Sequence, residues 1–268
     1  MHKWDPADYL KSSSAQYNWA MALIAGLKLH GDERVLDIGC GDGRITAHLA
    51  SQVPDGSVLG MDLSPEMIGF AAGKYADRSN LSFQVRDALQ LHYSADFDLV
   101  VSFACLHWIK DHLSVLKSVH QSLVPGGRFL MQCGGRGNAA RILDLTGHLT
   151  ASAPWNEYFS GFCFPYNFYG PQEYATWLAE AGLRPLRVEL VAKDMIHQGQ
   201  EGLEGIIRST WLPYTERIPA HLQGEFVKEI ARRYLEVYPL DENGRAHVQM
   251  MRLEVEAEKP RAGEAACR

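Results

Sequence analysis

Short apolar runs alternate with segments of helical periodicity through the first half of the chain. The runs Arg34–Ile38 and Phe97–Phe103 are almost wholly apolar, as are strands that a sheet buries on both faces. Between such runs, apolar residues recur at the spacing of an amphipathic helix. Five strands are predicted in this half, at residues 34–38, 57–61, 81–85, 97–103 and 128–132. Strands that alternate with helices in this way predict a parallel, doubly wound α/β sheet.

The second half of the chain follows a different pattern. Residues 138–165 predict helix and loop with many aromatic side chains, and residues 171–181 and 200–238 predict helices. Residues 184–191 and 246–257 return to strand patterns. We therefore expect a doubly wound, mostly parallel seven-stranded α/β sheet with helical cap insertions.

These patterns divide the chain into four parts. A helix predicted over residues 15–29 makes residues 1–30 an N-terminal helical cap segment, and residues 31–135 form the α/β core that binds the ligand. Residues 136–257 form a helical, aromatic substrate cap interleaved with the last strands. The polar tail, residues 258–268, is expected to be disordered.

Charge and hydropathy limit the class of partner. The chain of 268 residues carries 26 Lys plus Arg against 32 Asp plus Glu, a formal net charge of −6. This balance lacks the basic footprint of a protein that binds nucleic acid or an anionic membrane. There is no run of 18 apolar residues and no apolar signal core at the start. We expect a small-molecule substrate, and the pattern leaves the oligomeric state open.

The cysteines and histidines do not predict a metal site. The five cysteines are widely spaced and form no C-x-x-C motif, and the histidines lack metal-ligand spacing. We expect free thiols in a reducing compartment such as the cytoplasm, and no bound metal.

A glycine-rich turn joins the first predicted strand to the next helix. Gly39, Gly41 and Gly43 permit a tight turn and a close approach of the backbone to a ligand. A dinucleotide-binding turn has a further glycine where this chain has Arg44. That difference argues against a nicotinamide oxidoreductase.

Three aspartates mark the ends of the first three predicted strands: Asp37, Asp62 and Asp87. Ligands of open α/β sheets bind at the carboxyl ends of the strands, so these side chains are expected to line one crevice. Asp62 lies near the spacing from Gly39 that is typical of a ribose-binding acid. Taken singly, each aspartate has a structural role as an alternative to ligand binding, because aspartate is also common at helix N-caps and in turns.

As a set, these motifs resemble the class I S-adenosylmethionine-dependent methyltransferases. The resemblance lies in residues 35–43, 60–67, 86–88 and 123–127. It implies a Rossmann-like fold in which the glycine turn holds the methionine part of S-adenosylmethionine. The acids after strands two and three then hold ribose and adenine. The cofactor-binding residues that the resemblance implies are Asp37, Gly39, Gly41, Asp62, Leu63, Asp87, Ala88 and Phe103.

The segment after the fourth predicted strand, residues 103–109, is similar to its counterpart in juvenile hormone acid and trans-aconitate methyltransferases. Residues 13–17 resemble the juvenile hormone acid group, in which a glutamine of this helix reaches the substrate carboxylate. Residues 211–213 and 238–244 resemble the trans-aconitate group. Both groups esterify a carboxylate, so the resemblance implies methyl transfer to a small organic acid.

A carboxylate acceptor needs no general base, because its pKa near 4 leaves it ionised at neutral pH. The enzyme must position the carboxylate for an in-line displacement and exclude water. We predict that Gln16, His107 and Trp108 donate hydrogen bonds to it. An alcohol or phenol would instead use His107 as a base. Structural roles are the alternative for all three side chains.

The cap supplies candidate substrate contacts from aromatic and arginine side chains. They are Tyr17, Trp155, Tyr166, Arg208, Trp211 and Tyr214. The aromatic side chains are equally suited to core packing, and the arginine to a solvated helix face. Two alternatives to acid methylation stay open: O-, N- or C-methylation of a non-acid small molecule, and cofactor binding without catalysis.

Overall fold

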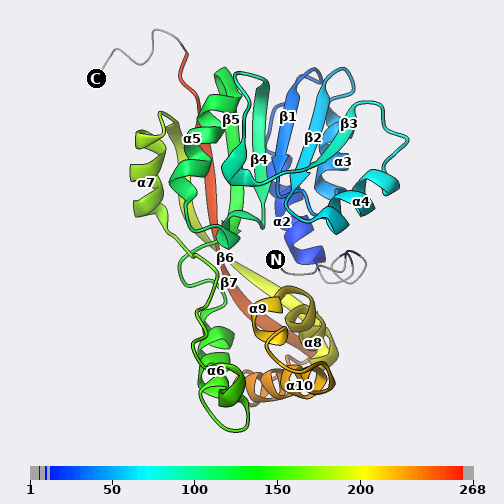
Figure 1. Ribbon diagram of the computed structural model, residues 1–268, viewed down its shortest axis with the longest axis vertical. Coiled ribbons are helices and arrows are strands. Elements are labelled where there is room, and N and C mark those ends of the chain that lie inside the picture. The colour runs from blue at the N-terminus through cyan, green and yellow to red at the C-terminus, as the bar shows by residue number, and fades with distance from the viewer. Residues whose placement is uncertain (1–5, 7–9, 11–12, 262–268) are drawn as a thin grey trace.

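The computed structural model describes residues 6, 10 and 13–261. It contains a seven-stranded sheet with helices packed against it and a smaller helical lobe at one end (Figure 1). The strand order is β3-β2-β1-β4-β5-β7-β6, in which β1 to β5 are parallel and β7 runs antiparallel to both its neighbours. The predicted mostly parallel, doubly wound α/β sheet is therefore confirmed. The strands are β1 (Arg34–Ile38), β2 (Ser57–Asp62), β3 (Leu81–Val85), β4 (Phe97–Phe103), β5 (Leu123–Gly134), β6 (Arg184–Gln198) and β7 (Arg245–Glu258).

The helices belong either to the sheet layers or to the lobe. Those associated with the sheet are α2 (Ser14–Ile24), α3 (Arg44–Gln52), α4 (Pro65–Lys74), α5 (His112–Ser122) and α7 (Pro171–Glu180), with the short 3-10 turns η1 (Ala88–Gln90) and η2 (Leu106–Trp108). Those of the lobe are α6 (Ala140–Thr150), η3 (Trp155–Tyr158), α8 (Gly199–Thr210), α9 (Leu212–Thr215) and α10 (Ala220–Val237).

Alternate residues of the central strands face opposite helical layers. Leu36 and Ile38 are fully buried in a cluster with side chains of α5 and α7. Val35 and Leu99 are buried in a second cluster with side chains of α2 and α3. Because successive strand residues point to opposite faces, a sheet covered on both faces requires apolar residues at nearly every position. That requirement explains the continuous apolar runs of the sequence.

The lobe is connected to the sheet by the last two strands, β6 and β7. Residues 252–258 of β7 pair with β5, whereas residues 245–251 pair with β6 alone. This two-stranded ribbon extends beyond the sheet into the lobe (Figure 1). There, side chains such as Leu203, Phe226 and Tyr234, all fully buried, form a separate core with Val248 of β7. The lobe thus has its own core while it shares a strand with the sheet.

Several boundaries differ from those predicted. The N-terminal helix ends at Ile24 and not at residue 29, because the chain turns at residues 25 and 26. Strand β6 continues to Gln198, where half-exposed ribbon residues give a weak apolar signal. The tail was expected to be disordered from residue 258, but Lys259 donates from its backbone N to Gly127 O (2.9 Å) and from Nζ to Leu123 O (2.7 Å). Residues 262–268 lie outside the described part.

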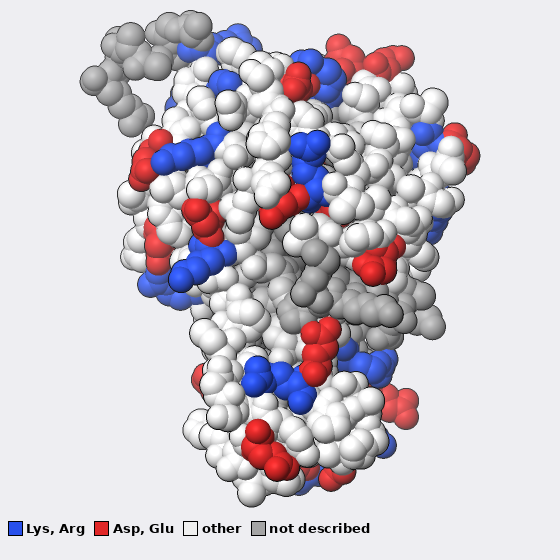
Figure 2. All heavy atoms as spheres, viewed as in Figure 1, with Lys and Arg blue, Asp and Glu red and all other residues white. Residues whose placement is uncertain are grey.

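The surface carries both signs of charge. On the face seen in Figure 2, basic and acidic side chains are interspersed over the sheet body and the lobe, and the molecule narrows between them. Within the part of the chain that the structure describes, no helix has the length and apolar character needed to cross a membrane.

Candidate active site

A cavity of about 340 Å³, the first cavity, lies at the carboxyl ends of the parallel strands. The glycine turn after β1, the end of β2 and the segments after β3 and β4 form its walls. The lining residues are Gly39, Gly41, Met61, Asp62, Leu63, Ser64, Met67, Arg86, Asp87, Ala88, Phe103, Ala104, Cys105, Trp108, Ile109 and Pro165. This is the position at which open α/β sheets bind ligands.

The glycine turn fits this wall only without side chains. Gly39 has a φ of +76° and Gly41 a φ of +54°, a left-handed conformation that favours glycine. A Cβ atom added to Gly39 would lie 2.2 Å from Cys105 Sγ, a severe overlap. The backbone N of Gly39 donates to Met61 O (2.7 Å), which holds the turn against β2. The glycine backbone therefore packs closely against Cys105 and borders the first cavity.

Asp62 and Asp87 lie on the same cavity, as the sequence predicts. Asp62 Oδ2 accepts a hydrogen bond from the backbone N of Gly41 (3.0 Å), and Oδ1 accepts one from Ser64 N (2.9 Å). Burial raises the pKa of Asp62, and these hydrogen bonds oppose that rise. Asp87 Oδ1 accepts from Leu89 N (2.9 Å) and caps η1. Each carboxylate is thus fixed by the backbone while it borders the cavity.

Asp37 differs from the other two aspartates. Its side chain is buried and accepts a hydrogen bond from Thr46 Oγ1 (2.8 Å). Burial raises its pKa to about 7. Asp37 borders a small third cavity beneath the glycine turn, together with Gln16 and Tyr17, and does not line the first cavity. This third cavity shares Gly39, Gly41, Phe103 and Ala104 with the first cavity, so Asp37 lies beside the first cavity without lining it.

A second cavity of about 100 Å³ lies between the sheet and the helical lobe. It borders the first cavity, because Ala104 and Trp108 line both. Its lining residues are Gln16, Ala104, His107, Trp108, Asn138, Ala139, Ile142, Leu143, Tyr166, Phe168, Met195, His197, Leu203, Ile206, Ile207, Thr210, Trp211, Val248, Met250 and Arg252. The sheet, both ribbon strands and the lobe helices therefore all contribute to it.

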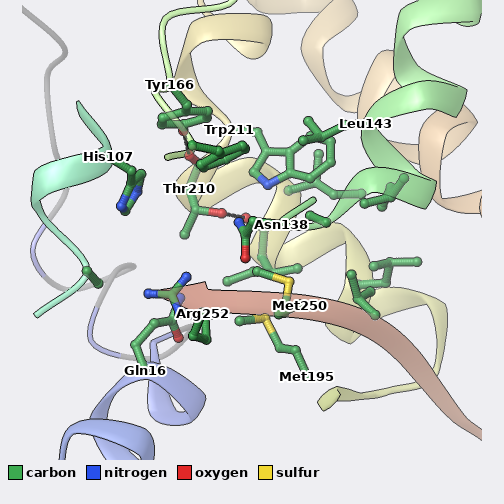
Figure 3. Close-up of a pocket in the computed structure, with 18 of the residues that line it drawn as sticks. Gln16, His107, Asn138, Leu143, Tyr166, Met195, Thr210, Trp211, Met250 and Arg252 are labelled. Carbon is green, nitrogen blue, oxygen red and sulfur yellow. Dashed lines mark hydrogen bonds between the residues drawn. The ribbon is translucent and has the colours of Figure 1, made fainter. Parts of the chain in front are cut away.

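Gln16, His107 and Arg252 come from three different elements and gather at one end of the second cavity (Figure 3). Arg252 of β7 is only 3% exposed, and its guanidinium lies 5.5 Å from the ring centroid of Trp19. Gln16 lies on α2, and its Oε1 has no hydrogen-bond partner within the described residues. We call this group the polar end of the second cavity.

His107 is a neutral hydrogen-bond donor in this arrangement. Burial and the nearby charge of Arg252 hold its pKa well below the usual value of 6.5. Its Nδ1 accepts a hydrogen bond from the backbone N of Gly134 (3.4 Å). A backbone N–H can only donate, so the ring proton resides on Nε2. Neither ring nitrogen is then set up to take a proton from a substrate.

Known proteins share this architecture over most of the chain. Residues 35–127 match the family described as "Methyltransferase domain". A methyltransferase of Schizosaccharomyces pombe is 31% identical over 204 residues, which are 72% of this chain and 75% of the relative. This chain belongs to the S-adenosylmethionine-dependent methyltransferases. A trans-aconitate 2-methyltransferase of Methylobacterium nodulans is similar to this methyltransferase over 97% of its chain and 100% of the relative, at 28% identity.

Solved structures support the same fold for this methyltransferase. The YcgJ protein of Bacillus subtilis covers 92% of it with a TM-score of 0.62 and 17% identity, and the match spans 100% of that chain. Phosphoethanolamine N-methyltransferase 2 of Haemonchus contortus, in complex with S-adenosyl-L-methionine, covers 96% with a TM-score of 0.60 and 20% identity, over 57% of that chain. The Rossmann-like methyltransferase fold implied by the sequence is confirmed.

Most residues predicted for this methyltransferase's site lie on one of these cavities. The first cavity is lined by all the predicted cofactor residues except Asp37. The second cavity is lined by Gln16, His107 and Trp108, and by two predicted substrate residues, Tyr166 and Trp211. Tyr17 lies on the third cavity, where the Arg44 guanidinium is 5.1 Å from its ring centroid.

Three predicted substrate residues lie away from both cavities. Trp155 is buried in the core of the lobe, with its ring centroid 5.0 Å from that of Phe226. Tyr214 is buried in the same core, 4.9 Å from Phe162. Arg208 lines a separate groove between α8 and α10, because the other side of α8 faces the second cavity. We do not include these three residues in the proposed site.

Sequence reasoning missed Arg252 and Asn138. Arg252 continues the alternation Val248, Met250, Arg252, which places one face of β7 on the second cavity. The sequence could have indicated Arg252, because this arginine stands at a position where the alternation of the strand predicts an inward-facing apolar residue. Asn138 is buried before α6, and its Oδ1 has no hydrogen-bond partner within the described residues.

Proposed function

We propose that this methyltransferase transfers the methyl group of S-adenosylmethionine to a carboxylate oxygen of a small organic acid. The observation that carries the proposal is the buried cation Arg252 at the end of the second cavity that also contains His107 and Gln16. That end borders the first cavity through Trp108 and Ala104. An anionic acceptor group placed there would lie beside the cofactor site.

The first cavity fits the cofactor. Gly39 and Gly41 both line the first cavity, so the backbone of the turn is accessible to the methionine part. Asp62 has lone pairs left to accept from ribose hydroxyls, and Asp87 is placed to accept from the adenine amino group. Leu63, Ala88 and Phe103 complete this wall. When bound, S-adenosylmethionine supplies an electrophilic sulfonium methyl group.

The chain's own residues orient the acid and exclude water. Arg252 and the Nε2–H of His107 are positioned to donate to the carboxylate oxygens, and the amide N–H of Gln16 adds a third donor. Tyr166 donates its hydroxyl to Thr210 O (2.6 Å), and its ring lies 4.4 Å from that of Trp108 in an edge-to-face contact. These rings shield the carboxylate from solvent, which strengthens the charged hydrogen bonds.

The state of His107 supports an acid over an alcohol as acceptor. An alcohol requires removal of its proton, and this neutral histidine already uses Nδ1 as an acceptor. A carboxylate is ionised and needs no base. The curated relatives named trans-aconitate 2-methyltransferase, which match 90% or more of this chain in several species, support an acid substrate for it.

We propose a reducing compartment such as the cytoplasm for the enzyme. Cys40, Cys105, Cys133 and Cys163 are free thiols, which supports this proposal.

A product assay tests the proposed function. The enzyme is incubated with methyl-labelled S-adenosylmethionine and separate panels of organic acids, alcohols and amines. We expect label in a base-labile ester and only with acids. A base-stable product would contradict the acid, and cofactor binding by calorimetry without any turnover would favour a module that does not catalyse.

A further inference from the structure

The second cavity offers one positive charge. Among its described lining residues, Arg252 is the only one with an ionised side chain at neutral pH. His107 is held neutral by burial and by Arg252. Burial also lowers the pKa of His197 to about 4, against a smaller opposing effect of Asp194. Arg252 is therefore the one cation that the described lining residues present to a carboxylate.

The second cavity is mostly apolar away from these groups, where Asn138, His197 and Thr210 are the neutral polar side chains among the lining residues. Leu143 of α6, Met195 of β6 and Met250 of β7 lie opposite the polar end (Figure 3). Side chains of α8 close the same end: Leu203, Ile206 and Ile207. Methionine side chains are flexible and fit apolar groups of varied shape. This end is suited to a hydrocarbon chain or ring.

The orientation of the two ends is fixed by the first cavity. Trp108 lines both cavities and follows His107 directly, so the polar end is the end that borders the cofactor site. An acid that enters with its carboxylate at the polar end has the rest of its structure between α6, α8 and the ribbon. Only the carboxylate then lies beside the first cavity.

We propose that the methyl acceptor is a monocarboxylic acid with an apolar body, whose carboxylate binds Arg252. This inference rests on the proposed function and specifies its substrate class. A tricarboxylate such as trans-aconitate would bury two further carboxylates in the same cavity, and the described lining residues offer no cation beyond Arg252. Burial of an unpaired charge among apolar side chains is strongly unfavourable. The chain thus differs in substrate class from relatives named for trans-aconitate.

A binding measurement separates this inference from the proposed function. Octanoate, octanedioate and trans-aconitate are titrated into the enzyme saturated with S-adenosylhomocysteine, and the fluorescence of Trp108 and Trp211 reports occupancy of the second cavity. We expect octanoate to bind at least about ten-fold more tightly than octanedioate, because the second carboxylate has no cation. Equal or tighter binding of either polyacid, or no binding of octanoate, would overturn the inference.

A charge-insertion variant tests the cause of the preference. Met250→Lys adds a cation at the apolar end, so we expect it to improve octanedioate binding relative to octanoate by about ten-fold or more. Met250→Leu keeps the end apolar and should keep the preference for octanoate. Turnover of the same acids is measured in parallel. Tight octanoate binding without ester formation would reject the proposed function alone, and esterification that favours polyacids would reject only the monocarboxylate.

Discussion

Individual buried charges determine what the groups around them can do. The guanidinium of Arg252 acts with burial to keep His107 neutral, so one residue provides the cation of the second cavity and preserves its neutral donor. At Asp37, burial likewise favours the neutral form, and for a carboxyl group this raises the pKa, here to about 7. Both effects lead to measurable changes in single variants.

Replacing Arg252 tests its contact with the acid. Arg252→Met is expected to lower kcat/KM for the acid by about 10- to 100-fold, because charge-assisted hydrogen bonds contribute about 1.5–3 kcal/mol. Arg252→Lys should restore part of the loss. Steady-state kinetics measures both variants. Arg136→Met, which removes an exposed arginine paired with Glu173, is the control and should act like the wild type. Unchanged kinetics in Arg252→Met would reject the contact.

The pH profile tests the neutral state of His107. Its pKa lies well below 6.5, so it stays an uncharged donor from pH 6 upwards. The groups that face it include Arg252 and His112, which both lower its pKa. Since the acid is also ionised there, we expect kcat/KM to be flat between about pH 6 and 8. A rise with a midpoint near 6.5 that disappears in His107→Gln would indicate a general base instead.

Asp37 makes the stability of the protein fall as pH rises. Its folded-state pKa of about 7 exceeds the ordinary aspartate value of 3.8, so the folded protein binds more protons between these two pH values. The free energy of unfolding therefore decreases as pH increases through that window. Asp37→Asn should reduce this decrease by about 2–4 kcal/mol. Urea unfolding at pH 4.5 and 7.5 measures the free energy of unfolding of the wild type and of Asp37→Asn. An equal change with pH in the two proteins would contradict the raised pKa of Asp37.

At the scale of elements, the strand-to-helix turn after β1 joins backbone geometry to ligand binding. Gly39 has a φ of +76°, and Cys105 occupies the space that a side chain at this position would need. The turn is tied to β2 through Met61 O and through the carboxylate of Asp62. A change in the turn is therefore expected to affect both folding and the first cavity.

A glycine-to-alanine pair tests this turn. Gly39→Ala should destabilise the protein by about 2–4 kcal/mol, because it adds left-handed strain to an overlap with Cys105. It should also weaken binding of S-adenosylhomocysteine. Gly69→Ala in α4 is the matched control, since its Cβ would meet nothing within 4 Å and alanine favours helix. Denaturant unfolding and calorimetry measure both variants; equal stability of the two would contradict the predicted overlap.

Features that depend on neighbouring residues could be predicted from the sequence, whereas features that depend on residues far apart in the chain could not. The strands and the turn were predictable because each has its own local pattern in the sequence. A local signal also marks the start of α4, where Ser64 Oγ accepts a hydrogen bond from Met67 N (3.3 Å) and caps the helix. Of the polar end, Gln16 and His107 were predicted, but Arg252 was not, because it lies far from both in the chain. Arg252 is followed in its strand by Glu254 and Glu256, a pattern that indicates surface ion pairs as readily as a binding site. Aromatic density likewise failed to separate Trp155, a core residue, from Trp211, a cavity residue.

At the scale of the whole molecule, two separately packed bodies share β6 and β7. The first cavity belongs to the sheet body, and the apolar end of the second cavity belongs to the lobe and the ribbon. Each body has its own buried core. Cofactor binding and acid binding should therefore respond differently to damage in each core.

Two core truncations test this separation. Phe226→Ala removes a fully buried ring from the lobe core and should cost about 3–5 kcal/mol. We expect it to raise KM for the acid and to leave the affinity for S-adenosylhomocysteine within about two-fold. Phe129→Ala in the sheet core should weaken both. Loss of cofactor-product affinity in Phe226→Ala to the same degree as in Phe129→Ala would show that the bodies do not act separately.

The division of the second cavity between two bodies has an evolutionary consequence. The methyl donor and the reacting oxygen depend on the sheet, on α2 and on Arg252 of β7, whereas the far wall is supplied by α6, α8 and the ribbon of β6 and β7. Substitutions on those helices can lengthen, shorten or reshape the accepted hydrocarbon while the reaction centre stays intact. Enzymes with this architecture can therefore acquire new acid substrates through a few substitutions in α6 and α8, while methyl transfer itself is kept.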